Sequence, residues 1–245
     1  MNKEIYELLK DKKRLKEEKL FIVDTEKILK EILENNLEIR YFLYCESAKD
    51  ILELLPQNKK RDALKVKESY INKFSVVDSH QGFIAVVRAK NNEIVDLKGI
   101  DKLVLLDTIQ EPSNLGAIIR SGIAFGFANF LLLNCAYLYN EKVIRASAGA
   151  VFQCRYKNIE INEIDRLKAE YQIIATSSKN GLNLKKIKEK IKNKFIIVLG
   201  NEGRGINKVI EEKADLKISI ELKKEIESLN VAAASAIIFY ELTNF

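Results

Sequence analysis

A chain of 245 residues, 47% hydrophobic and 31% charged, is long enough for one large α/β domain or two smaller ones. Its net charge of +6 favours a polyanionic partner, although a lysine-rich solvated surface gives the same value. Three cysteines far apart in the sequence argue against a disulfide framework and a zinc site. No apolar run is long enough to cross a bilayer and no signal region opens the chain, so we expect a cytoplasmic protein without a membrane or metal partner.

The first part of the chain alternates short helices and strands, which is typical of a compact α/β unit. Apolar runs and helical periodicity mark these elements, and Pro56 ends one of the helices. We expect strands at 20–23, 39–44, 76–77 and 83–87, and helices at 3–19, 26–34 and 50–55.

Two basic clusters lie in this part of the chain, one in the first helix and one in an expected loop after Pro56. Such clusters are consistent with a solvated surface as well as with a contact to a polyanion. They consist of Lys12, Lys13 and Arg14, and of Lys59, Lys60 and Arg61.

A short polar connection leads to the second part, and we place the domain boundary there, with domains at 1–95 and 96–245. Continuous apolar strands that alternate with helices predict a parallel sheet covered on both faces. Ligands of such sheets bind beyond the carboxyl ends of the strands. We expect strands at 103–106, 129–133, 171–176 and 195–199, and helices from Asn114, at 184–192 and at 228–242.

The first motif follows the strand at 103–106 and runs from Glu111 to Arg120. Pro112 breaks the strand, and Asn114 is a good N-cap for the next helix. Arg120 is the one guanidinium in a helix of small and apolar residues, and an arginine is seldom buried there without an anionic partner. A structural salt bridge and a functional anion both satisfy that requirement.

Two further motifs follow apolar strands. Leu199-Gly-Asn-Glu-Gly-Arg-Gly-Ile206 lacks both the dinucleotide fingerprint and the Lys-Ser/Thr pair of a phosphate-binding loop. It is consistent with a simple glycine-rich turn, yet Glu202 lies among backbone N–H groups that are free to hold a ligand. In the third motif Ser228 is a plausible N-cap, and Asn230 is a poor helix former whose amide we expect to have a distant partner.

Taken together, the three stretches resemble motifs one to three of the SpoU/TrmH branch of the SPOUT RNA methyltransferases. They are Pro-Ser-Asn-Leu-Gly-Ala-Ile-Ile-Arg120, Leu-Gly-Asn-Glu-Gly-Arg-Gly-Ile206, and Ile220 with Glu-Ser-Leu-Asn-Val231. Ala146-Ser-Ala-Gly-Ala150 and the first domain are also similar to that family. The sequence departs from the family pattern at Glu111 (usually Asp), at Glu221 (commonly Pro) and at Asp24-Thr25 (usually Glu-Gly).

The resemblance implies a C-terminal α/β trefoil-knot domain with a parallel sheet, preceded by a smaller α/β substrate-binding domain. It also implies a homodimer and S-adenosylmethionine held in the knot largely by backbone groups. Carried over by position, the cofactor contacts fall at Gly200, Ile220 and Leu229, with Leu199 and Thr176 as walls of the site. We expect the two basic clusters to contact RNA.

The reaction that the resemblance implies is methyl transfer to a ribose 2′-hydroxyl of RNA. Because a hydroxyl is a poor nucleophile near neutral pH, the site must orient it and stabilise the developing alkoxide. We expect Arg120 to act as a clamp on the RNA phosphate and as an electrostatic stabiliser, since a guanidinium is a poor base. Asn114, Glu202, Ser228 and Asn230 would position the reactants, and Glu202 is the best candidate for a proton acceptor.

Three alternatives remain open from the sequence. Ribosomal RNA of the large subunit is the expected substrate by analogy, and transfer RNA is the competing one. A non-catalytic RNA-binding protein could keep the same fold. A nucleotide-dependent enzyme would use residues 200–205 as a phosphate loop, but the lysine that reaches the phosphates is missing.

Overall fold

The computed structural model describes residues 3–76, 80–177, 181–184, 187–201, 203–223 and 227–243. The chain forms two compact units. The first comprises the residues up to Asn91 together with Tyr139–Phe152, and the second comprises Asn92–Leu138 and the residues from Gln153 onward. The chain first passes from one unit to the other after Asn91, close to the expected boundary at residue 95. The packing of Tyr139–Phe152 with the first unit has no signal in the sequence. The functional division into 1–95 and 96–245 stays a prediction.

A four-stranded sheet in the order β1-β4-β2-β3 forms the centre of the first unit. β1 (Leu20–Val23) and β2 (Ile39–Tyr44) both pair antiparallel with β4 (Phe83–Arg88). β3 (Leu64–Lys65) pairs parallel with β2 and forms one edge of the sheet. The strand expected at 76–77 is absent at Val76, which lies in a bend, and Val77 lies outside the described residues.

Helices flank this sheet, and two of them begin at a capping residue or a proline. Residues 3–19 do not form the single helix that their composition predicts, because the Asp11 carboxylate accepts a hydrogen bond from the Arg14 amide at 2.9 Å and starts a second helix. Lys59, Lys60 and Arg61 lie in a helix rather than a loop, because Pro56 precedes its first turn. The helices are α1 (Lys3–Lys10), α2 (Lys12–Glu17), α3 (Glu26–Glu34), η1 (Glu46–Ala48), α4 (Lys49–Leu52), α5 (Gln57–Asp62) and α6 (Glu68–Phe74).

The segment Tyr139–Phe152 packs on β1. It contains α8 (Glu141–Ala146) and the 3₁₀ turn η2 (Ala150–Phe152). The ring of Phe21 stacks on the rings of both Tyr139 and Phe152, with centroids 5.7 and 5.6 Å away. These aromatic contacts explain why the segment belongs to the first unit although its neighbours in sequence belong to the second.

The second unit contains a seven-stranded sheet in the order β7-β6-β5-β10-β8-β11-β9. Every pair of neighbouring strands is parallel, which confirms the expectation from the continuous apolar runs. The strands are β5 (Lys102–Asp107), β6 (Asn129–Leu133), β7 (Arg155–Asn158), β8 (Gln172–Thr176), β9 (Leu182–Asn183), β10 (Phe195–Leu199) and β11 (Leu216–Ser219).

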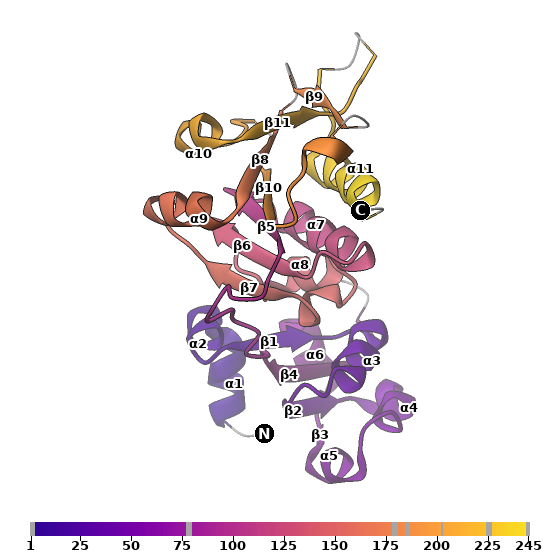
Figure 1. Cartoon of the computed structure of the whole chain (residues 1–245). Helices are drawn as coiled ribbons and strands as arrows, with labels where there is room; N and C mark the ends of the chain where they lie inside the picture. The colour runs from indigo at the N-terminus through magenta and orange to yellow at the C-terminus, as the bar shows by residue number, and fades with distance from the viewer. Residues whose placement is uncertain are drawn as a thin grey trace. The chain divides into compact units, whose positions relative to one another are not determined.

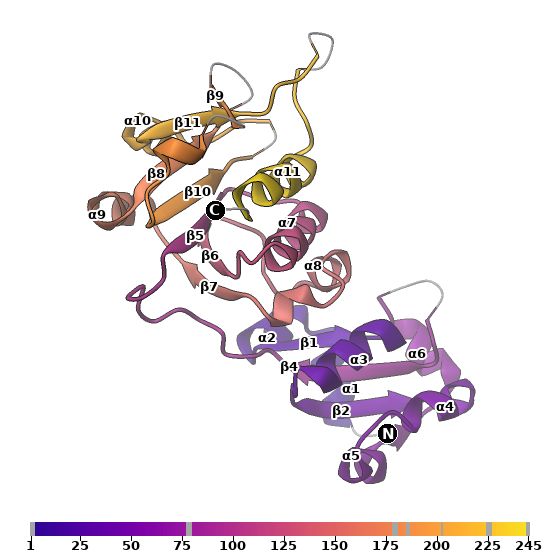
Figure 2. The ribbon, with the colours of Figure 1, turned by 45° about the vertical axis from the view of Figure 1, so that its right-hand side comes forward.

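Helices cover both faces of this sheet (Figures 1 and 2). α7 (Pro112–Ala124) and α11 (Val231–Thr243) lie side by side on one face, where the ring of Phe127 stacks on that of Phe239 at 4.9 Å. α9 (Ile164–Glu170) and α10 (Lys208–Lys213) pack their apolar side chains against alternate strand residues on the other face. An α-helix is expected at 184–192, but the described residues of this stretch show 3₁₀ structure instead, at Leu184 and in η5 (Lys188–Lys190). A further 3₁₀ turn, η3 (Ile161–Glu163), precedes α9.

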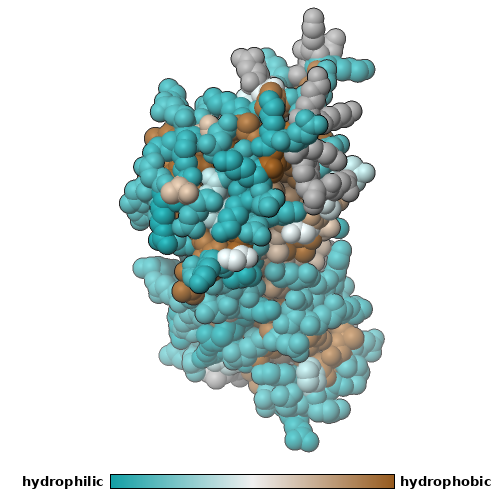
Figure 3. Space-filling model, in the orientation of Figure 1, coloured by the Kyte–Doolittle hydropathy of each residue, from teal (hydrophilic) through white to brown (hydrophobic). Residues whose placement is uncertain are grey.

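Most side chains on the face drawn in Figure 3 are polar, with apolar side chains in small groups. Among the described residues, no helix combines the length and the apolar character that a membrane crossing requires.

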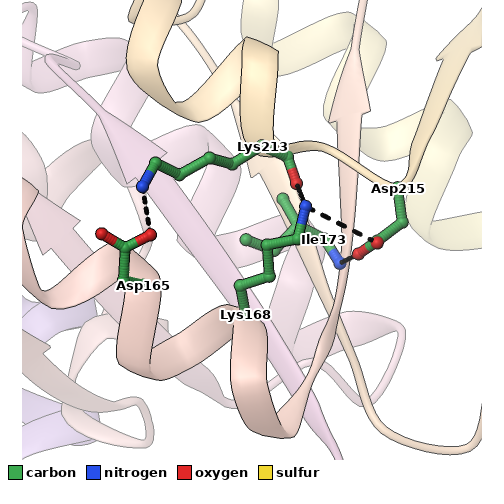
Figure 4. A network of polar contacts seen from close by, with 5 residues as sticks. All are labelled: Asp165, Lys168, Ile173, Lys213 and Asp215. Atoms are coloured by element: carbon green, nitrogen blue, oxygen red, sulfur yellow. Dashed lines mark hydrogen bonds and ion pairs between the residues drawn. The ribbon is translucent and has the colours of Figure 1, made fainter.

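A polar network joins α9 to the connection between α10 and β11 (Figure 4). The Asp215 carboxylate accepts a hydrogen bond from the Ile173 amide at 2.8 Å and lies 3.9 Å from the Lys168 ammonium. Lys168 also donates to the Lys213 carbonyl at 2.7 Å, and the Lys213 side chain pairs with Asp165. Because β11 leads into the third motif, this network fixes the strand on which that motif depends.

We predict that Asp215→Ala lowers the free energy of unfolding by about 1–3 kcal/mol, because it leaves the Ile173 amide without its side-chain acceptor. The matched variant is Asp165→Ala, whose side chain is 74% exposed and whose ion pair should contribute less than ~1 kcal/mol. Urea denaturation of both variants measures the difference. Equal losses would contradict this role of Asp215.

Candidate functional site

A cavity of about 610 Å³ opens at the carboxyl ends of three neighbouring strands of the second unit. Its lining includes the ends of β8, β10 and β11, together with the residues that lead into α11. This is the edge at which parallel α/β sheets bind their ligands. All the residues expected to contact the cofactor line it, namely Thr176, Leu199, Gly200, Ile220 and Leu229.

The turn after β10 forms one wall of the cavity, and it requires a glycine at its start. A Cβ atom built on Gly200 would lie 2.5 Å from the carbonyl carbon of Gly205 and 2.6 Å from the amide nitrogen of Ile206. The turn closes through two backbone hydrogen bonds between Asn201 and Gly205, of 3.0 and 2.8 Å. Gly205 adopts a φ of +72°, which favours glycine. The backbone therefore doubles back on itself with no room for a side chain.

Side chains from the end of β5 hold the same turn in place. The Asn201 amide group donates to the Thr108 carbonyl at 3.0 Å, and the Asp107 carboxylate accepts from the Asn207 amide at 2.6 Å. Asp107 is buried, and its other oxygen accepts from the Thr108 hydroxyl at 2.8 Å. A buried carboxylate with these partners makes the turn rigid.

The opposite wall comes from the end of β11. The Ser219 hydroxyl donates to the Gly181 carbonyl at 3.1 Å, and a Cβ atom on Gly181 would lie 2.4 Å from the carbonyl carbon of Ile218. Glu221, where the resembled family commonly has proline, accepts a hydrogen bond from the Asn183 side chain at 2.8 Å. At position 221 this chain therefore has a hydrogen bond from β9 to a carboxylate, instead of the backbone restriction that a proline would impose.

The first and third motifs meet at Asn114 and Asn230. The side-chain amide of Asn230 donates to the side-chain oxygen of Asn114 at 3.1 Å, so the expectation of a distant partner is confirmed. The Asn230 side-chain oxygen accepts from the amides of Ala232 and Ala233 at 2.9 and 3.4 Å, which makes Asn230 the N-cap of α11. The capping role predicted for Ser228 is therefore wrong, and Ser228 lies exposed on the lining of the cavity.

The cap predicted for Asn114 is also wrong, because the N-cap of α7 lies three residues earlier. Pro112 occupies the first helical position, for which its fixed φ is suited, and Glu111 is the N-cap. The Glu111 carboxylate accepts from the Ser113 hydroxyl at 3.1 Å. Glu111, where the resembled family has Asp, thus keeps the helix start intact and leaves the Asn114 side chain available to Asn230.

Arg120 projects from α7 and is exposed. It makes no hydrogen bond or ion pair with the described residues, so the alternative of a structural salt bridge finds no support among them. Arg120 and Asn114 do not line the cavity themselves, and Asn114 reaches it through Asn230. Glu202 lies outside the described residues, so its predicted role stays a prediction.

Sequence reasoning missed the one charged side chain among the described lining residues, Arg204. Its only signal is its position inside the glycine-rich motif. Asn201, which ties the turn to β5, also escaped notice because its partner is far away in sequence.

Burial raises the pKa of the nearby Cys135 thiol, which follows β6, to about 11, so this thiol is not a nucleophile at neutral pH. Across the described ranges, no three His, Cys, Asp or Glu side chains are arranged to hold a metal ion.

The positive charges of the two basic clusters of the first unit are partly neutralised by neighbouring carboxylates. The Arg14 guanidinium donates to Glu18 at 2.6 Å, and Lys13 lies 3.8 Å from Glu17. Lys60 pairs with Glu53 across the turn between α4 and α5. These contacts reduce the number of free cations that either cluster offers to a polyanion.

Family models match both halves of the chain. The model of the SpoU rRNA Methylase family matches residues 101–240, and that of the MRM3-like substrate binding domain matches residues 3–85. Together they cover most of the two regions that the sequence predicts as separate domains.

Individual known proteins are similar to this chain over different shares of its length. The chain is 35% identical over 144 residues to the 23S rRNA (guanosine(2553)-2′-O)-methyltransferase RlmP of Bacillus subtilis, a match that covers 58% of this chain and 57% of that protein. It is 28% identical to a tRNA/rRNA methyltransferase homologue of Mycoplasma pneumoniae, over 86% of this chain and 91% of that one. The AdoMet-bound rRNA methyltransferase of Sinorhizobium meliloti superposes with a TM-score of 0.80 at 21% identity, covering 97% of this chain and 92% of that one, and shares the fold.

We predict that Gly200→Ala disrupts the cavity, because the added Cβ atom meets backbone atoms that cannot move aside separately. Binding of S-adenosylmethionine, followed by calorimetry, should fall at least about 10-fold, with a loss of stability of about 1–3 kcal/mol. Gly203→Ala in the same turn is the control, since its Cβ atom would meet only the Asn201 side-chain oxygen at 3.6 Å. Similar affinities for the two variants would show that the turn does not shape the binding site.

Proposed function

The chain belongs to the SpoU rRNA methylase family, and we propose that it transfers a methyl group from S-adenosylmethionine to a ribose 2′-hydroxyl of RNA. The observation that carries this proposal is the cavity at the carboxyl ends of β8, β10 and β11, in which the residues of the second and third motifs meet. The hydrogen bond between Asn230 and Asn114 brings the first motif to the same place. The protein is therefore an RNA methyltransferase, and a purely structural role is disfavoured.

The residues of the cavity fit S-adenosylmethionine. A volume of about 610 Å³ suits a ligand of that size. Leu199, Ile220 and Leu229 offer apolar walls for an adenine, and Gly200 lies on the lining beside them. Arg204 supplies a cation for the carboxylate of the methionine part. When bound, the cofactor supplies the electrophilic methyl group.

The side chains around the cavity orient the RNA and stabilise the charge that develops on it. Arg120 has no partner among the described residues, so its guanidinium is available to bind an RNA phosphate and to stabilise the alkoxide formed from the 2′-hydroxyl. Asn230 is held by its capping contacts and by Asn114, which makes it a positioning residue. Ser228 lies on the lining next to it. Glu202 remains the candidate that accepts the hydroxyl proton.

Ribosomal RNA of the large subunit is the substrate we propose. The match of residues 3–85 to a substrate binding domain supports a dedicated RNA-holding unit. The named relative RlmP acts on 23S rRNA, which favours ribosomal over transfer RNA. We place the reaction in the cytoplasm, where that RNA is made.

The C-terminal knot and a homodimer belong to the same proposal. α11 exposes two large apolar side chains, Ile237 at 40% and Tyr240 at 57% exposure, and the ring of Phe125 packs edge-on against Tyr240 at 5.8 Å. An apolar strip of this kind on a surface otherwise rich in charge is typical of an association site. A second copy of the chain is the partner that we propose for it.

We predict that Arg120→Ala lowers methyl transfer by at least about 10²-fold, because the clamp on the phosphate and the stabilisation of the alkoxide are lost together. The measurement is the transfer of labelled methyl groups from S-adenosylmethionine to ribosomal RNA, with 2′-O-methylation confirmed by nuclease-resistant dinucleotides. Cofactor affinity should change little. Arg166→Ala, an exposed arginine on α9, is the matched control.

Two outcomes would overturn these assignments. An Arg120→Ala enzyme that works at nearly the wild-type rate would remove Arg120 from the reaction. A wild-type protein that binds RNA but gives no heat with S-adenosylmethionine would be a non-catalytic RNA-binding protein of this fold.

For the dimer, we predict that Ile237→Glu shifts the protein to monomers in analytical ultracentrifugation, because it places a charge in the apolar strip of α11. Val209→Glu is the control, since Val209 is similarly exposed (41%) but lies on α10, on the other face of the sheet. A wild-type protein that is monomeric at all concentrations would refute the proposed dimer.

A further inference from the structure

A second cavity, of about 510 Å³, lies in the first unit, where β3 leads into α6. It is built from one short stretch of the chain that the sequence motifs do not include. The edge strand β3 contributes Lys65, the connection contributes Lys67, and α6 contributes Tyr70 and Lys73. Val66 and Ser69 complete the lining.

The lining is basic. Three of its six residues are lysines, and none of the described lining residues is acidic. Lys67 makes no ion pair with the described residues, and Lys65 shares the Glu46 carboxylate with Lys49, so this single negative charge serves two ammonium groups. Lys73 is held over the ring of Tyr6 at 5.0 Å and donates to the Tyr6 hydroxyl at 2.6 Å. The cavity therefore keeps an excess of positive charge in a fixed place.

Tyr70 adds a hydroxyl for which the described residues offer no hydrogen-bond partner. The residue is 8% exposed, and its buried hydroxyl makes no hydrogen bond with the described residues. An unsatisfied buried hydroxyl costs about 1–3 kcal/mol and is rare in folded proteins. Burial raises the pKa of Tyr70, so the hydroxyl keeps its proton and can donate. An oxygen acceptor from outside the chain would satisfy it.

We propose that this cavity binds a backbone phosphate of the RNA substrate, with Lys67 and Lys73 as its cations and the Tyr70 hydroxyl as its hydrogen-bond donor. A phosphate combines the negative charge that the lysines need with the acceptor oxygens that Tyr70 lacks. The inference rests on the proposed function for the identity of the polyanion. It gives the first unit an anchoring site of its own, distinct from the cofactor cavity of the second unit.

The lysines of this cavity differ from the two clusters that the sequence points to. Arg14 and Lys60 are bound to neighbouring carboxylates, whereas Lys67 remains available. The cavity lysines are separated by two and six positions in the sequence, and an edge strand followed by a helix brings them to one place. No run of basic residues marks them, so composition does not reveal the site.

The test measures the affinity of the full-length protein for a large-subunit ribosomal RNA fragment at a series of salt concentrations. Each phosphate contact contributes about 0.7–0.9 to the slope of log K against log salt. Lys67→Ala should reduce the slope by about that amount and weaken binding several-fold. Lys208→Ala, an exposed lysine on α10, should leave both unchanged.

Tyr70→Phe separates a ligand role from a structural one. It keeps the ring, which packs against Phe74 at a centroid distance of 5.0 Å, and removes only the hydroxyl. We expect a thermal midpoint equal to or above that of the wild type, together with a several-fold loss of RNA affinity and a higher KM for RNA at unchanged kcat. Affinity for S-adenosylmethionine should stay the same in every variant.

Three results would overturn the inference. RNA affinity and salt slope equal to wild type in both Lys67→Ala and Tyr70→Phe would remove the RNA phosphate from this cavity. Binding of inorganic phosphate that depends on Tyr70, without any effect on RNA, would assign the cavity to a free anion. Binding of an acidic peptide in its place would assign it to a protein partner. If the wild type instead methylates no RNA, the proposed function fails, and the RNA-binding measurement still decides the cavity.

Discussion

The close approach of the backbone at Gly200 to that at Gly205 and Ile206 is the constraint on which the second unit depends. Contacts of 2.5–2.6 Å to a hypothetical Cβ atom leave room for hydrogen alone, so the turn exists only because position 200 is glycine. This turn lines the cavity and places Arg204 on its wall. A cofactor held by main-chain atoms needs a backbone fixed in this way, because no side chain can adjust afterwards.

Hydrogen bonds between distant parts of the chain turn three separate loops into one site. Asn201 reaches Thr108, Asn207 reaches Asp107, and Asn230 reaches Asn114, across separations of about one hundred residues. The first two bonds join the connection between β10 and α10 to the end of β5, and the third joins the residue before α11 to the first turn of α7. Polar groups that satisfy one another in this way, with the Asp107 carboxylate buried among them, favour a single arrangement, which the in-line geometry of the proposed methyl transfer requires.

The cavities of the two units differ in the charge of their lining residues. Among the described residues, the cavity of the second unit is lined by neutral residues and Arg204, whereas the first unit carries a lysine-rich cavity with a hydroxyl donor that none of them accepts from. In the function that we propose, phosphate contacts of the first unit contribute affinity without reading base identity, and the cavity of the second unit supplies the chemistry. Arg120 of the second unit takes part in both in our proposal, because an exposed guanidinium can bind phosphate and stabilise negative charge.

The sequence by itself determined the parallel sheet, the extent of its central strands and the three motifs, because continuous apolar runs and glycine-rich turns are local signals. It also predicted that the amide of Asn230 has a distant partner. Only the tertiary structure decided that Asn230 rather than Ser228 caps α11, that Glu111 caps α7, that Tyr139–Phe152 packs on β1, and that Lys65, Lys67 and Lys73 share a cavity. Competing caps lie only two or three residues apart, and the choice between them depends on contacts that no local pattern records. Lys65 and Lys73 line one cavity because the chain turns from β3 into α6 between them.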